Sequence, residues 1–128
     1  MKIPDFTGFT ILIAEDNLQN AEYVQITLDK TGAVILSATN GEEAVELCSG
    51  HPEINLVLMD AMMPKMNGFD AARQIRKFNT SVPIIVLTAY VSTTTIHETV
   101  DAKCNDFLAK PIGPEELFMI IKKWLGKE

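Results

Sequence analysis

The sequence predicts an α/β fold in which helices cover both faces of one parallel sheet. Five short apolar segments alternate along the chain with five segments that have helical periodicity. Two of the apolar segments, residues 56–59 and 84–87, contain no polar side chain, which is typical of strands buried on both faces. Right-handed crossovers between parallel strands make such a sheet doubly wound. The length of 128 residues is that of a single domain.

Composition and charge narrow the functional classes. Apolar residues make up 47% of the chain, and the net charge is −6. This charge argues against a general nucleic-acid or anionic-membrane surface and is compatible with a cation site. The sequence has no apolar run of about 20 residues and no signal-peptide pattern, so we expect no membrane insertion of this domain. Cys48 and Cys104 lack metal-ligand spacing, and we interpret them as buried free thiols in a reducing, cytoplasmic compartment.

The chain begins with a segment without periodicity, residues 1–9, which we interpret as a lead-in to a domain spanning residues 10–128. The first strand is expected at residues 10–14. Asn17 has a side chain suited to capping the helix that follows, and Gly32 suits the left-handed position at its end. The inward face of this helix should consist of Ala21, Val24 and Leu28.

A short second strand is expected at residues 34–36. Asn40 and Glu43 then have the spacing of a capping box at the start of the second helix. One face of that helix should consist of Ala44, Leu47 and Cys48. The third strand follows and ends on a carboxylate, that of Asp60.

The pair Asn67-Gly68 is of a kind that also occurs in hairpin turns. Its flanks do not alternate, however, and apolar residues continue at helical spacing, so we expect a helix at about residues 68–78. The apolar residues at this spacing are Phe69, Ala72 and Ile75. The fourth strand follows this helix and ends on Thr88.

The helix expected at residues 91–102 has the weakest signal, because its many β-branched residues disfavour the helix slightly. Ile96 and Val100 still share one face of it. The fifth strand is expected at residues 106–109. The last helix has Pro114 at its first position and acids in its first turn. Its apolar stripe consists of Leu117, Ile120, Ile121 and Trp124.

The apolar content of the strands predicts their order in the sheet. The first, third and fourth strands are the most apolar and should be central, whereas the shorter second and fifth should be edges. This gives the order 2-1-3-4-5, the flavodoxin-like (βα)5 arrangement. In such sheets ligands bind at the carboxyl ends of the strands, next to the switch point between the first and third strands.

Polar residues stand at the carboxyl ends of four of these strands. The first strand is followed by Glu15 and Asp16, and the third ends on Asp60, so three carboxylates should meet at the switch point. Carboxylates at close range need a shared proton or a divalent cation, and Mg²⁺ binds to such groups. Thr88 and Lys110 join the same rim and add a hydroxyl and an ammonium group. This set suits a phosphoryl group, with a carboxylate as nucleophile.

Each of these residues also has an ordinary structural explanation when it is taken alone. Acids begin helices, hydroxyls stand at strand ends, and most lysines are solvated surface charges. The functional interpretation rests on their joint placement at the ends of separate strands.

At these positions the chain resembles the receiver domains of two-component response regulators. The matching motifs are ILIAEDN at residues 11–17, DAMMPKMNG at 60–68, LTA at 87–89 and KP at 110–111. The resemblance extends over essentially the whole of the expected domain. It implies a phosphoacceptor that catalyses its own phosphorylation and has no independent substrate.

The resemblance assigns a role to each acid of the rim. Asp60 would accept a phosphoryl group from a phosphohistidine of a histidine kinase or histidine phosphotransfer domain. Asp16, Asp60 and the backbone carbonyl of Met62 would ligate Mg²⁺ (or Mn²⁺), and Glu15 would act on the ion through water.

The resemblance also implies a switch. Lys110 and Thr88 would hold phosphoryl oxygens, and Phe107 would turn inward as Thr88 moves toward the phosphoryl group. The helix at residues 91–102, the fifth strand and the last helix would form the face that changes, because this weakly encoded helix directly follows Thr88. The same face is a possible dimer contact.

Two further expectations concern phosphate chemistry. By resemblance, Met62 and Tyr90 flank the path of the hydrolytic water, and neither offers a carboxylate or amide to orient it, so we expect slow dephosphorylation. We interpret His51 and His97 as surface residues, because a phosphodonor histidine needs a helical-bundle setting.

The lead-in and the EDN triplet at residues 15–17 resemble receivers of hybrid sensor histidine kinases, so we expect a receiver from such a kinase; a stand-alone response regulator is the alternative.

A small Mg²⁺-dependent aspartyl-phosphate phosphatase would need an acid two residues after Asp60, where this chain has Met62. A flavin-binding electron carrier would need a Ser/Thr/Gly-rich loop after the first strand, where this chain has its acids.

Overall fold

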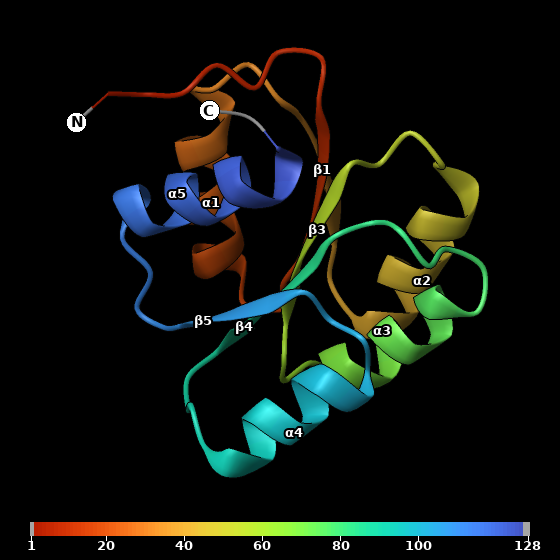
Figure 1. Cartoon of the computed structure of the whole chain (residues 1–128). Helices are drawn as coiled ribbons and strands as arrows, with labels where there is room; N and C mark the ends of the chain where they lie inside the picture. Colours follow the sequence, from red (N-terminus) through yellow and green to blue (C-terminus); the bar gives the residue numbers. More distant parts are fainter. Residues whose placement is uncertain (1, 127–128) are drawn as a thin grey trace.

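A computed structural model describes residues 2–126 and confirms the predicted α/β architecture (Figure 1). Five parallel strands form one sheet in the predicted order β2-β1-β3-β4-β5. The strands are β1 (Thr10–Ala14), β2 (Val34–Ala38), β3 (Leu56–Asp60), β4 (Ile84–Thr88) and β5 (Asp106–Ala109). The helices are α1 (Leu18–Asp29), α2 (Gly41–Gly50), α3 (Gly68–Arg76), α4 (Thr93–Asp101) and α5 (Pro114–Leu125). Residue 1 of the predicted lead-in and residues 127–128 of the predicted domain lie outside the described residues.

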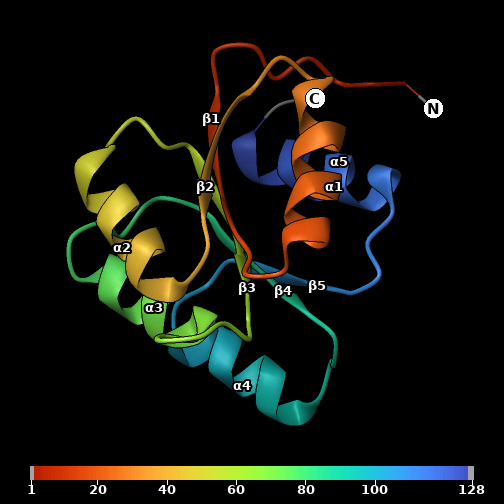
Figure 2. The same ribbon diagram turned by 180° about the vertical axis from the view of Figure 1, so that it is seen from behind.

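Helices cover the sheet on both faces, and each strand alternates its side chains between two cores. Helices α1 and α5 lie on one face, and α2, α3 and α4 lie on the other, as two opposite views show (Figures 1 and 2). In β3, Leu56 and Leu58 pack toward α1 and α5, whereas Val57 and Met59 pack toward α2 and α3. All five residues of β3 and of β4 are buried. Within residues 2–126, no helix has the length and apolarity needed to cross a membrane.

Asparagine caps begin three of the helices. In each case the asparagine side chain accepts a hydrogen bond from the backbone N–H three residues later; the residues are Asn17, Asn40 and Asn67. The helix predicted after Asn67-Gly68 therefore forms, and a hairpin does not. The capping box predicted at Asn40 is wrong in one part, because the Glu43 carboxylate accepts from the backbone and hydroxyl of Thr39. Helix α3 ends at residue 76, two residues earlier than predicted, and β2 continues two residues beyond its predicted end.

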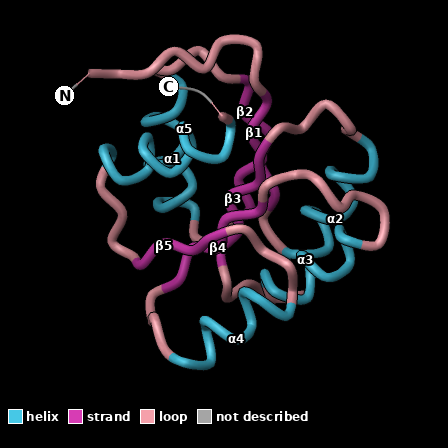
Figure 3. Tube along the Cα trace, viewed as in Figure 1, coloured by secondary structure: helices cyan, strands magenta, loops and turns pink. Residues whose placement is uncertain are grey.

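Helix α4 is shorter than the predicted 91–102, because Ser92 caps its amino-terminal end. The segment before it is a loop (Figure 3). Ile96 and Val100 share a face as predicted, but that face is open to solvent, with 46% and 72% of each residue exposed. The buried residues of the helix are Thr95 and Thr99.

The lead-in has a packing role that its sequence does not indicate. Phe6 is fully buried in the core beneath α1 and α5, and its backbone N–H donates to the Thr31 carbonyl at 2.8 Å. Gly32 has the predicted left-handed conformation, with φ of 82°, and a Cβ there would lie 2.6 Å from the Thr7 hydroxyl. The segment before β1 is therefore packed against the turn that follows α1.

Candidate functional site

Three carboxylates meet where β1 and β3 end side by side. Glu15 and Asp16 directly follow β1, and Asp60 is the last residue of β3. One oxygen from each of the three lies within 4.8 Å of the other two. Glu15 and Asp60 are buried, with 4% and 6% of each residue exposed, whereas Asp16 is open to solvent. Hard carboxylate oxygens at this spacing fit Mg²⁺, which binds through few carboxylates and keeps several waters.

Lys110 lies between the two buried acids. Its Nζ donates to Glu15 Oε1 at 2.9 Å and lies 3.2 Å from Asp60 Oδ1. Because Lys110 follows β5, this contact joins residues that are 95 positions apart in the sequence. The ammonium group offsets part of the negative charge that the fold concentrates here.

Burial and mutual repulsion shift the pKa values of this cluster. Burial, followed by the hydrogen bond and charge of Glu15, raises the pKa of Asp60 to about 7, against the opposing effect of Lys110. Burial would raise the pKa of Glu15 as well, but hydrogen bonds with Asp60 and Lys110 outweigh it and hold that pKa below its usual value. Without a bound cation, the folded protein therefore retains a proton on Asp60 well above the pH at which an exposed aspartate loses it.

This retained proton predicts an unusual pH dependence of stability. Between pH 3.8 and about 7 the native protein holds a proton on Asp60 that the unfolded chain has lost, so its contribution to the free energy of unfolding falls as pH rises. Asp60→Asn should remove this loss and should stabilise the metal-free protein at pH 8 by on the order of 2–4 kcal/mol. Urea unfolding in EDTA at pH 4 and pH 8 measures the difference.

Asp29→Asn, at an exposed position at the end of α1, is the matched control and should leave the pH dependence unchanged. An Asp60→Asn protein that loses as much stability between pH 4 and pH 8 as the parent would contradict the prediction.

Thr88 ends β4 on the same rim, and its hydroxyl is bound to the backbone of the loop that follows the strand. Thr88 Oγ1 donates to the Tyr90 carbonyl at 2.8 Å, and the Tyr90 N–H lies 3.2 Å from the same hydroxyl. Phe107 is half-buried in the adjacent edge strand β5. The structure thus brings Lys110 and the acids together and leaves the Thr88 hydroxyl bound to the loop that follows its strand.

Met62 and Tyr90 lie on the wall of an open groove beside Asp60. The groove has a volume of about 570 Å³ and runs between the start of α3 and α4. The two residues are 77% and 82% exposed. The Met62 N–H also donates weakly to Asp60 Oδ1, at 3.4 Å.

Gly68 has a role at the site that sequence reasoning missed. A Cβ at this position would lie 2.2 Å from the Asp60 carbonyl oxygen, so only glycine lets α3 begin this close to the end of β3. The sequence signal was the glycine at the end of the DAMMPKMNG motif, which we interpreted only as a helix start.

The histidines and cysteines lie in ordinary surroundings. His51 pairs with Glu53 at 3.0 Å on the surface, and His97 is exposed on α4. Cys48 and Cys104 are free thiols as predicted; Cys48 is buried, whereas Cys104 is only half-buried. Burial raises the pKa of both thiols to about 11.

Comparison with known proteins gives one consistent family. The model of the response regulator receiver domain matches residues 11–122. The hybrid signal transduction histidine kinase M of Dictyostelium discoideum is 36% identical over 119 residues, which are 88% of this chain and 5% of the kinase. The chain therefore spans only a small part of that relative.

Two solved structures have the same fold. The receiver domain of the sensor histidine kinase PA1611 from Pseudomonas aeruginosa PAO1, with magnesium coordinated in its active-site cleft, has a TM-score of 0.86 and 32% identity. That alignment covers 94% of this chain and all of the other. The receiver domain of a Saccharomyces cerevisiae response regulator, crystallised with a histidine phosphotransfer protein, has a TM-score of 0.86 and 30% identity. It covers 97% of this chain and 91% of the other.

Proposed function

Since this chain belongs to the response regulator receiver domain family of two-component signalling, we propose that Asp60 is its phosphoacceptor. The observation that carries this proposal is that the Asp60 carboxylate lies close to both other acids and to the Lys110 ammonium group. In a phosphorelay, Asp60 would take a phosphoryl group from a phosphohistidine of a partner protein.

The acidic cluster supports a magnesium site. Asp16, Asp60 and the backbone carbonyl of Met62 would bind Mg²⁺ (or Mn²⁺), with Glu15 acting through water. A bound divalent cation supplies charge stabilisation for phosphoryl oxygens and relieves repulsion among the carboxylates. The relative whose structure contains magnesium in its active-site cleft supports this assignment.

The chain's own residues account for the transfer step. An Asp60 carboxylate oxygen attacks phosphorus, the P–N bond to the donor imidazole breaks, and the imidazole nitrogen leaves with the electron pair. Lys110 already lies 3.2 Å from Asp60 and would stabilise the negative charge on the phosphoryl oxygens. The Thr88 hydroxyl would leave the Tyr90 carbonyl to donate to one of those oxygens, and Phe107 would turn inward.

Incubation with acetyl phosphate tests the proposed function without any partner. With Mg²⁺ present, intact mass should show the gain of one phosphoryl group, and with EDTA the mass should not change. A protein that gains no phosphoryl group in Mg²⁺ while it remains folded would overturn the assignment.

The partner would be a histidine kinase or a histidine phosphotransfer domain. Exposed apolar residues on α1, next to the acidic cluster, offer a contact surface for it: Leu18, Tyr23 and Ile26. We propose that the domain is the receiver of a hybrid sensor histidine kinase and lies in the cytoplasm, and its kinase relatives and two free thiols support this. A stand-alone regulator is the alternative. We also propose that the face formed by α4, β5 and α5 could serve as a dimer contact, because apolar residues on α4 are exposed there.

We expect the phosphoryl group to be long-lived, because Met62 and Tyr90 offer no group that orients an attacking water. Met62→Asn would place an amide beside Asp60 and should shorten the lifetime several-fold. Loss of phosphoprotein mass over time, after removal of acetyl phosphate, measures this lifetime. Met119→Asn changes an equally exposed methionine on α5 and should have no effect. A parent protein that decays faster than Met62→Asn would contradict the expectation.

A further inference from the structure

Helix α4 is held in place by polar contacts on the side where a surface helix normally packs apolar residues. Its apolar side chains, Ile96 and Val100, face solvent, and its buried residues are Thr95 and Thr99. The Thr99 hydroxyl donates back to the Thr95 carbonyl at 2.7 Å within the helix. The buried side chains within α4 are thus polar, and an apolar contact with the core comes just after it, from its C-cap residue Ala102.

The amino-terminal half of α4 shares a hydrogen-bond acceptor with the proposed phosphorylation site. The Tyr90 carbonyl accepts from the Thr88 hydroxyl at 2.8 Å and from the Thr95 hydroxyl at 2.9 Å. Thr88 is the last residue of β4, and Thr95 lies in the first turn of α4. A change in the Thr88 hydroxyl bond consequently alters the acceptor that anchors α4.

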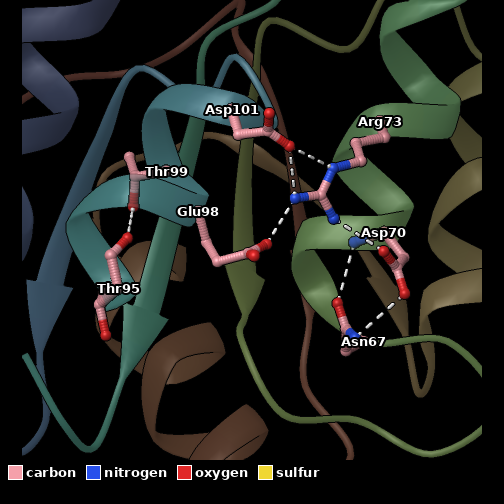
Figure 4. A network of polar contacts seen from close by, with 7 residues as sticks. All are labelled: Asn67, Asp70, Arg73, Thr95, Glu98, Thr99 and Asp101. Carbon is pink, nitrogen blue, oxygen red and sulfur yellow. Dashed lines mark hydrogen bonds and ion pairs between the residues drawn. The ribbon is translucent and has the colours of Figure 1, made fainter. Parts of the chain in front are cut away.

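Arg73 of α3 contacts the carboxyl-terminal half of α4 (Figure 4), whereas Arg76 of α3 donates to the Lys103 carbonyl just beyond the helix, at 2.9 Å. Arg73 donates through Nε and Nη2 to the Asp101 carboxylate, at 3.1 and 2.8 Å, and through Nη2 to Glu98. Two acids close to the carboxyl end of α4 are unfavourable against the negative end of its dipole. The guanidinium group neutralises both acids. Its contacts should therefore stabilise α4 more than an ordinary surface ion pair does.

Arg73 is itself held from the side of the phosphorylation site. Its Nη1 donates to Asp70 at 2.8 Å, and Asp70 accepts from the Asn67 amide at 3.1 Å. Asn67 caps α3 at the end of the loop that follows Asp60 (Figure 4). The contacts thus run without a break from that loop, through α3, to α4.

We propose that Arg73 is a positioning residue that latches α4 in the resting arrangement, in which the Thr88 hydroxyl is bound to the Tyr90 carbonyl. This inference rests on the proposed function of Asp60 and adds a regulator of the same site. When Thr88 turns toward a phosphoryl group, the Tyr90 carbonyl loses one of its two donors, α4 shifts, and the contacts of Arg73 with Glu98 and Asp101 are released, so the latch belongs to the resting arrangement. Removing the latch destabilises the resting arrangement, so the phosphorylated arrangement is reached more easily.

Binding of beryllofluoride with Mg²⁺ tests the latch, because this anion mimics a phosphoryl group on a carboxylate. Arg73→Met should bind it about two- to fivefold more tightly than the parent, the range expected from loss of partly exposed ion pairs. The double variant Glu98→Gln/Asp101→Asn should show the same gain, and combining all three changes should add little more. Amide exchange in α4 should rise in the unliganded variants.

A merely structural role for Arg73 would weaken beryllofluoride binding or leave it unchanged, so either result in folded Arg73→Met overturns the latch. Lys77→Met, at the exposed residue after α3, is the matched control and should bind like the parent. The double variant changes the half-buried Glu98 and the exposed Asp101 on α4, and it keeps the test available if Arg73→Met unfolds. If the parent itself does not bind beryllofluoride, the proposed function and the latch both fail; if the parent binds and the variants match it, only the latch fails.

Discussion

Replacing Asp60 by asparagine is expected to abolish phosphorylation by acetyl phosphate. The amide lacks the anionic oxygen that attacks phosphorus, and the neighbouring acids are differently placed. Glu15 is buried and bound to Lys110, whereas Asp16 is open to solvent. Under conditions in which the parent gains one phosphoryl group, intact mass of Asp60→Asn should show none.

The same substitution separates loss of function from loss of folding. Because Asp60→Asn should stabilise the metal-free protein, we expect it to be folded in the assay, and urea unfolding in the assay buffer checks this directly. Asp16→Asn is the matched comparison: it should still accept a phosphoryl group on Asp60, but only at a higher Mg²⁺ concentration. Phosphorylation of Asp60→Asn at the parental rate would place the acceptor elsewhere on the rim.

Replacing Lys110 by methionine should slow phosphorylation by about a hundredfold or more, the usual effect of removing one charged donor from a transition state. The ammonium group lies 3.2 Å from Asp60, where negative charge would develop in the proposed transfer. Methionine keeps much of the length of the side chain and removes the charge. Initial rates of mass gain at saturating Mg²⁺ measure the effect.

The same variant should bind Mg²⁺ more tightly than the parent, because Lys110 no longer competes for Glu15 and Asp60. Lys77→Met removes an exposed lysine outside the site and should change neither rate nor affinity. A Lys110→Met protein that is phosphorylated as fast as the parent would show that the ammonium group does not act on the transferred phosphoryl group.

Local patterns were enough to predict most of the fold. The asparagine caps at residues 17, 40 and 67 act within three residues of the chain, and the burial of a strand follows from its own side chains. Strand order then predicted which carboxylates meet. The contact of Lys110 with Glu15 follows from the same order, because β1, β3, β4 and β5 all end on one rim.

The parts that sequence did not predict depend on choices between nearby partners. The Glu43 carboxylate can reach the backbone N–H of Asn40 or of Thr39, and the folded chain uses Thr39. The Thr88 hydroxyl likewise donates to the Tyr90 carbonyl, two residues further along the chain. Such hydrogen bonds depend on backbone direction, which residue type and spacing leave open.

Helix α4 is the clearest case of tertiary structure overriding local pattern. Its sequence showed that Ile96 and Val100 share a face but did not show that this face would be exposed. The attachment that decides its position comes from Arg73, 28 residues before Asp101, and no periodicity relates the two. The same is true of the buried Phe6, which packs beneath helices far along the chain.

A crystal structure of the protein with Mg²⁺ and beryllofluoride is the most direct test of the central claim, that the acids at the ends of β1 and β3 bind a cation so that Asp60 can capture phosphorus. Beryllium should be bound to Asp60, with the cation on Asp16, Asp60 and the Met62 carbonyl. Lys110 and Thr88 should each contact a fluorine, with the Thr88 hydroxyl released from Tyr90. Beryllofluoride on another residue, or a cation away from the three carboxylates, would contradict the account.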